Sequence, residues 1–145
     1  MNIHRIVFRV LLMIVGLTTL VASQVASVAD EATTKRHASM IGLVRTINTL
    51  ELRELNQYGS YEPWVILLAH HREEFSAWLK RFYFSDGTNV QFSDALEILP
   101  DWNLRLNIQK DGKGYVLLLD DAGDKTGFAA VSDERAVIRT GEYLR

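Results

Sequence analysis

The longest periodic pattern in the chain runs from Asp30 to Asn56 and predicts an amphipathic helix. Apolar residues recur along it at spacings of three and four, which places their side chains on one helical face. They are Met40, Leu43, Val44, Ile47 and Leu50, with Ile41, Leu52 and Leu55 widening the stripe. Asp30 and Glu31 suit the positive end of the helix dipole, and Gly59 predicts the end of the helix. The stripe covers about 200 degrees of arc, so we expect this helix to contact two surfaces.

A second helical stripe follows Pro63, a residue that is tolerated in the first turn of a helix. Its members are Trp64, Leu67, Leu68, His71, Phe75, Trp78, Leu79 and Phe82. Large aromatic side chains on such a stripe predict core packing rather than a ligand-binding surface. Asp86–Asn89 predicts the end of this segment. Ser93–Leu99 is interpreted as a loop before Pro100, with a short helical turn as the alternative.

After residue 101 the apolar period changes from 3.6 to two, which predicts strands. Trp102–Gln109 alternates apolar and polar residues, and Asp111-Gly112 then predicts a tight reversal into a second strand, Tyr115–Leu119. Further strands are predicted at Phe128–Ser132 and Ala136–Arg139. The chain is therefore predicted to have the α+β fold class, with a long helix and a second helix packed on a four-stranded antiparallel meander.

The first 29 residues have the pattern of an export signal. Arg5 and Arg9 precede an apolar run, Val10–Ala22, of about the length of a secretory h-region. Small residues follow, and Ser27-Val28-Ala29 before Asp30 predicts cleavage between Ala29 and Asp30, with cleavage after Ser23 as the second choice. The alternative is that the segment is retained as an N-terminal anchor, because about 20 helical residues can just cross a bilayer. The sequence thus predicts a protein that is exported to the periplasm, the cell envelope or the extracellular space.

Removal of residues 1–29 would leave 116 of the 145 residues, enough for one domain with one core. That part keeps 14 of the 16 basic residues and all 18 acidic residues, with acids and bases interspersed. Its net charge of about −4 argues against a nucleic-acid partner. The chain has no cysteine, which excludes a disulfide scaffold and thiol chemistry.

Two blocks of the chain resemble type IV pilin-like proteins. Arg45–Glu51 reads Arg-Thr-Ile-Asn-Thr-Leu-Glu and Tyr58–Pro63 reads Tyr-Gly-Ser-Tyr-Glu-Pro, similar to the second half of the pilin helix and the turn after it. Ser132–Arg139, near the end of the chain, resembles the last hairpin of that family. The resemblance covers roughly residues 38–64 and 102–140. It implies a pilin or pseudopilin globular domain whose partners are pilus or secretion-system subunits, or further copies of itself.

The chain departs from that family at its front end. Pilins are cut before a Phe-Thr-Leu-x-Glu phrase that opens their hydrophobic helix, and this phrase is absent here. Gly16–Leu20 is the nearest approximation, with Val21 in the place of the family's acid. If signal peptidase removes the apolar run, the mature protein resembles a pilin headgroup without its stalk. It would then cap or accompany a filament, and it would contact a membrane only if the N-terminal segment were retained.

Two groups of residues are weak candidates for metal ligands, although the sequence indicates no cofactor. His70 and Glu74 are spaced by one helical turn and would face one ion, though not in a metalloprotease motif. Asp120, Asp121 and Asp124 lie in a glycine-bearing turn, where calcium tolerates irregular oxygen ligands. In both cases the simpler interpretation is a solvated polar surface, with His71 at the edge of the core.

Glu51 falls inside the apolar arc of the first helix, between Ile47 and Leu55. A buried carboxylate there would need a partner, either Arg105 or a base of a neighbouring subunit, unless the helix rotates and Glu51 reaches water. Tyr58, Tyr61 and Trp64 at the corner between the helices are, with Glu51, candidates for an interface, although aromatic residues at such corners more often close a core.

No nucleophile elbow or glycine-rich phosphate loop is present in the sequence. We therefore expect a structural or assembly component of the cell envelope or its surface filaments, which acts through protein contacts. The alternatives are a soluble periplasmic or secreted binding module with a pilin-like fold, and a small hydrolase whose site carries no recognisable motif.

Overall fold

The computed structural model describes the backbone of residues 3–82 and 90–142, and side chains from residue 31 onward. The chain divides into two compact units, residues 1–36 and 37–145. The first unit consists of helical turns of α1 (Ile3–Tyr58), with an exposed ion pair between Lys35 and Glu31. The predicted start of this helix at Asp30 was wrong, because the helix is continuous from Ile3 and no proline interrupts it. Whether residues 1–29 are removed stays a prediction.

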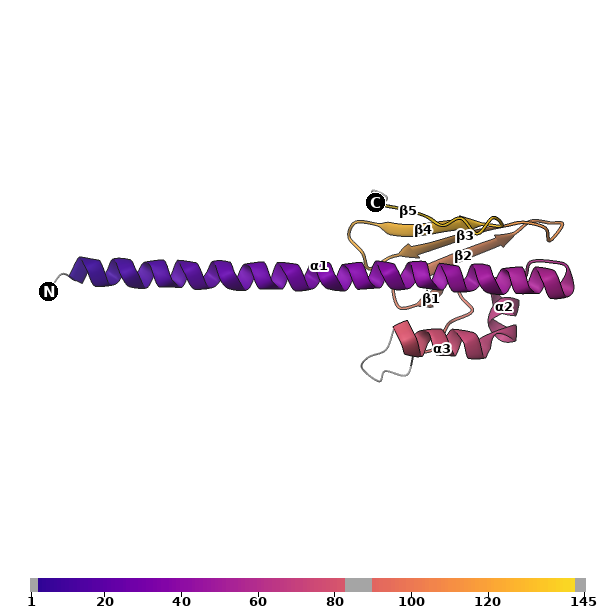
Figure 1. Cartoon of the computed structure of the whole chain (residues 1–145), viewed down its shortest axis with the longest axis horizontal. Helices are drawn as coiled ribbons and strands as arrows, with labels where there is room; N and C mark the ends of the chain where they lie inside the picture. The colour runs from indigo at the N-terminus through magenta and orange to yellow at the C-terminus, as the bar shows by residue number, and fades with distance from the viewer. Residues whose placement is uncertain (1–2, 83–89, 143–145) are drawn as a thin grey trace. The chain divides into compact units, whose positions relative to one another are not determined.

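Over its described residues, 37–82 and 90–142, the second unit is an α+β domain in which part of α1 and two further helices accompany one antiparallel sheet (Figure 1). The predicted second helix is two helices, α2 (Trp64–His70) and α3 (Arg72–Phe82). They are separated at His71, which has φ −117° and ψ 34°. The predicted end of this segment at Asp86–Asn89 lies outside the described residues. Among the residues whose side chains are described, no helix is both long and apolar enough to cross a membrane.

The sheet has five strands in chain order, each antiparallel to the next, rather than the predicted four. They are β1 (Glu97–Leu99), β2 (Trp102–Ile108), β3 (Tyr115–Asp121), β4 (Phe128–Asp133) and β5 (Arg139–Glu142). The register places Leu104 opposite Leu119, and Leu119 opposite Ala130, so one face of the three central strands is apolar.

The strand β1 lies in the segment that was interpreted as a loop. A strand of three residues is too short to show alternation, so its pairing with β2 could not be recognised from the sequence. The last strand was predicted too early in the chain. Ala136 has φ +57° and its N–H donates to the carbonyl of Asp133, so Ala136 belongs to a turn, and pairing with β4 begins only at Arg139.

The core joins the helices to the sheet. The centre of the α1 stripe is buried as predicted, with Met40, Leu43, Val44 and Ile47 at 0 % and Leu50 at 2 % exposure. Of the residues predicted to widen it, Ile41 and Leu55 are partly buried and Leu52 is exposed. On the second stripe, Phe82 is exposed and Leu68 is only partly buried, while five of the eight predicted positions are buried apolar residues. They are Trp64, Leu67, Phe75, Trp78 and Leu79. One cluster contains these residues together with the apolar face of β2, β3 and β4.

Gly59 ends α1, as predicted, and directs the chain back toward the sheet. Its φ of +82° is unfavourable for any residue with a Cβ, and its N–H donates to the Leu55 carbonyl at 2.9 Å. Two residues later, the Tyr61 N–H donates to the carbonyl of Gly112 in the β2–β3 turn at 3.0 Å. This bond fixes the segment after α1 against the sheet and positions the polar residues described next.

Candidate functional site

The buried part of α1 carries three polar side chains at a spacing of three residues. Asn48, Glu51 and Glu54 are 6 %, 0 % and 1 % exposed. A buried polar group is costly unless it is hydrogen-bonded, and a buried charge is costlier still. The contacts of these three residues therefore show how each buried polar group is stabilised in the core.

Asn48 is fully paired with the sheet. Its amide Nδ2 donates to the Ser132 hydroxyl at 2.8 Å, and its Oδ1 accepts from the Tyr115 hydroxyl at 2.9 Å. All three residues are buried. Burial raises the pKa of Tyr115, so this hydroxyl remains a donor. The network fixes the register of α1 on β3 and β4.

Glu51 has a different environment from the one that the sequence predicted. Its Oε2 accepts from the backbone N–H of Glu62 at 3.0 Å, and its Oε1 is buried without a hydrogen-bond partner among the described residues. Arg105 is exposed and does not pair with it, and the carboxylate does not reach water. Desolvation raises the pKa of Glu51 to about 7, with a smaller contribution from the charge of Glu54. Glu51 is thus a carboxyl group that prefers its neutral form in the folded protein.

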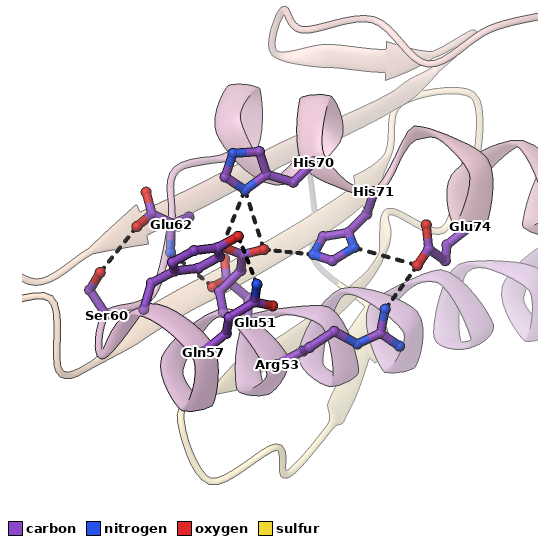
Figure 2. Close-up of polar contacts among 10 residues, drawn as sticks. Glu51, Arg53, Gln57, Ser60, Glu62, His70, His71 and Glu74 are labelled. Carbon is purple, nitrogen blue, oxygen red and sulfur yellow. Dashed lines mark hydrogen bonds and ion pairs between the residues drawn. The ribbon is translucent and has the colours of Figure 1, made fainter.

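Glu54 joins α1 to the corner between α2 and α3. Its Oε1 lies 2.7 Å from His71 Nε2, and both of its oxygens lie 3.3 Å from His70 Nδ1. Figure 2 shows His70 and His71 at this corner, with Glu74 and Arg53 beside His71. His71 Nδ1 in turn lies 3.5 Å from Glu74 Oε1, which accepts from Arg53 at 2.8 Å. We call Arg53, Glu54, His70, His71 and Glu74 the Glu54 cluster. Its carboxylate at Glu54 is buried, and its ion pair between Arg53 and Glu74 is half-exposed.

A backbone hydrogen bond at the start of α3 is the main cause that lowers the pKa of Glu74. Burial opposes it, and hydrogen bonds with Arg53 and His71 lower the pKa further. Glu74 is therefore a carboxylate across the neutral range. His70 and Glu74 do not form the predicted pair, because the break at His71 places them on different helices. Among the described side chains, no group of three or more potential ligands is placed to hold a metal ion.

The aspartates of the β3–β4 loop also bind protein groups. Asp121 is buried, and its Oδ1 accepts from the N–H groups of Gly123 and Asp124. Asp124 binds the His37 ring at 2.5 Å and accepts from the N–H and hydroxyl of Thr126, both at 2.9 Å. Burial opposes ionisation of Asp124, but these hydrogen bonds outweigh it and lower its pKa. Asp120 accepts from the Asn103 amide at 3.2 Å, so the three carboxylates do not converge on one ion.

Burial divides the residues that were predicted to form an interface. Tyr58 is 58 % exposed, whereas Tyr61 and Trp64 are buried and, like Glu51, cannot be touched by a partner. Tyr61 stacks edge-on against Tyr115, and Trp64 Nε1 donates to the Ser93 carbonyl at 2.9 Å. These two aromatic residues close the core, and only Tyr58 remains available for contact.

Sequence reasoning identified Glu51 but missed the Glu54 cluster and the pairing of His37. Glu54 lies one turn after Glu51 on α1, so both residues belong to the same region of the helix surface. This spacing was the sequence signal from which a second buried carboxylate could have been predicted. His37 stacks on Phe128 with ring centroids 3.8 Å apart, a contact between residues distant in the sequence.

Comparison of the chain with profiles of protein families, with curated proteins and with solved structures finds no match. The functional interpretation therefore depends on the sequence and on the geometry described above.

Proposed function

We propose that this protein is an exported, pilin-like structural or assembly component of the cell envelope or its surface filaments, which acts through contacts with other proteins. The observation that carries the proposal is that one helix, α1 (Ile3–Tyr58), contains both the apolar run Val10–Ala22 and the amphipathic stretch that packs against an antiparallel sheet. A filament subunit needs both parts, one for assembly and one to hold the exposed domain.

The polar chemistry of the domain supports a contact role. The buried polar side chains of α1 bind other groups of the same domain, which stabilises the arrangement of its elements. Several apolar side chains of the domain remain exposed, among them Leu52, Tyr58, Val65 and Ile66. Exposed apolar residues on a secreted domain are candidates for contact with partner subunits.

The proposal is tested by fractionating native cells that produce the full chain with an epitope tag. The proposal takes the alternative in which the N-terminal segment is retained, so we expect the protein in the membrane fraction and in material sheared from the cell surface. The matched control is Ile14→Lys, which places a charge in that run at a cost of about 3 kcal/mol for membrane insertion and leaves residues 37–145 unchanged. This variant should be absent from the membrane fraction and from the sheared material. Recovery of the unsubstituted protein as a monomer in the soluble periplasmic fraction would contradict the proposal and favour a soluble binding module.

A further inference from the structure

The Glu54 cluster contains a histidine between two carboxylates. His71 Nε2 faces Glu54 Oε1 at 2.7 Å and His71 Nδ1 faces Glu74 Oε1 at 3.5 Å. Ionised carboxylates only accept hydrogen bonds, and neutral imidazole has one N–H. Both contacts are therefore satisfied only when His71 carries two protons and a positive charge.

The ionisable groups around His71 are mostly acidic. The ionisable groups in and beside the cluster come from three places. Arg53, Glu54 and Tyr58 lie on α1, and His70, His71 and Glu74 lie at the α2–α3 corner. Glu51, one turn before Glu54, interacts in turn with Glu62 after α1 and with Tyr115 on β3. Acids outnumber permanent cations in this set, in which Arg53 is the one permanent cation. The histidines supply the remaining positive charge, and Glu54 and His71 interact in a region that is almost dry.

We propose that the Glu54 cluster is a pH-sensitive clamp, which holds the α2–α3 corner on α1 at mildly acidic pH and releases it as the pH rises and His71 loses its proton. Deprotonation breaks one of the two contacts of His71 and leaves Glu54 without its buried counter-charge. Ionisation of Glu51, one turn away, then adds a second negative charge close to Glu54. Both events act in the same direction.

The release is expected to be local. His71 lies at the break between α2 and α3, and the corner is held there by two backbone bonds, from His71 N–H to the Leu67 carbonyl and from Phe75 N–H to the His71 carbonyl. Leu117, in the middle of β3, pairs with strands on both sides. If the corner opens, the amides of His71 and Phe75 become exposed to exchange, whereas the amide of Leu117 stays protected.

The test is amide hydrogen exchange of the full 145-residue chain, followed by NMR at pH 5.5 and pH 8. After correction for the intrinsic rate, exchange at His71 and Phe75 should rise about tenfold more than at Leu117, which corresponds to the loss of about 1.4 kcal/mol of local stability. In His71→Gln this extra rise should disappear, with the corner open at both pH values. The matched control is His37→Gln, which removes a histidine paired with Asp124 outside the cluster and should retain the extra rise.

The imidazole signals of the unsubstituted protein provide a second measurement if His71→Gln does not fold. These signals report directly whether the His71 ring carries the same number of protons at pH 5.5 and at pH 8. Equal corrected rates at the corner and at Leu117, or a His71 ring with the same number of protons at pH 5.5 and pH 8, would overturn the proposal.

Discussion

Glu51 provides the sharpest test of the structure, because its environment converts directly into a pH dependence of stability. The substitution Glu51→Gln keeps the size of the side chain and an oxygen that can accept from the Glu62 N–H, but it removes the ionisable group. In the folded protein the pKa of Glu51 is raised from 4.5 to about 7. The neutral form is thus favoured in the folded state relative to the unfolded state.

The sign and the size of the effect follow from linkage between protonation and folding. Below pH 4.5 the group is protonated in both states, and its contribution to stability is fully present. As the pH rises toward 7, the unfolded chain loses this proton first, so the folded state loses stability. A shift of 2.5 pKa units corresponds to about 3 kcal/mol, which is lost between pH 4.5 and pH 7 and stays constant above.

The assay is urea unfolding followed by the fluorescence of Trp64, Trp78 and Trp102, all of which are buried. We measure the free energy of unfolding of both proteins at pH 4.5 and at pH 7.5. Over this rise in pH, the unsubstituted protein should lose about 3 kcal/mol more stability than Glu51→Gln. The exposed Glu73→Gln is the matched control and should show no such change. Parallel pH profiles of Glu51→Gln and the unsubstituted protein would refute the buried, neutral carboxyl group.

Three further predictions concern stability. Asn48→Ala leaves the hydroxyls of Tyr115 and Ser132 without their shared partner and should cost about 2 to 3 kcal/mol in urea unfolding; a cost below that of an exposed Asn107→Ala would contradict the network. Gly59→Ala forces a Cβ into a backbone with φ +82° and should cost about 1 kcal/mol, whereas an unchanged melting temperature would argue against this helix end. Because the pKa of Asp124 is lowered, its contribution is present above its unfolded pKa and lost as the pH falls through the folded value. Asp124→Asn should therefore lose less stability than the unsubstituted protein on acidification from pH 5 to pH 3, and equal losses would exclude this role.

Local patterns predicted most of the helices and strands. Two patterns were sufficient to predict α1 and β2: the apolar stripe from Met40 to Leu50 and the alternation in Trp102–Ile108. Burial of one face gives a helix an apolar period of 3.6 and a strand a period of two. The break at His71 was not predictable from local propensity, since neither glycine nor proline marks it and Glu54 binds the ring from another helix. The strand β5 was misplaced because the apolar Val137 and Ile138 resemble a strand, although the turn at Ala136 delays pairing until Arg139.

The candidate site was predictable only in part. Glu51 was identified because it interrupts an apolar arc, yet its partner is a backbone N–H, which no sequence pattern marks. The contacts of Glu54 with His70 and His71 join residues 16 and 17 positions apart, and that of His37 with Asp124 joins residues 87 apart. Such pairs depend on how the helices and the sheet pack together, so a sequence alone does not determine them.

The proposed function takes the alternative in which the N-terminal segment is retained, over the cleavage between Ala29 and Asp30 that the small-residue pattern predicts, and it treats α1 as a single functional element. The measurement that tests it most directly is the intact mass of the protein purified from native cells. The proposed assembly role predicts a mature chain that still contains Val10–Ala22. A chain that begins at Asp30 would confirm the predicted cleavage and contradict retention, and it would leave a headgroup that lacks the apolar run.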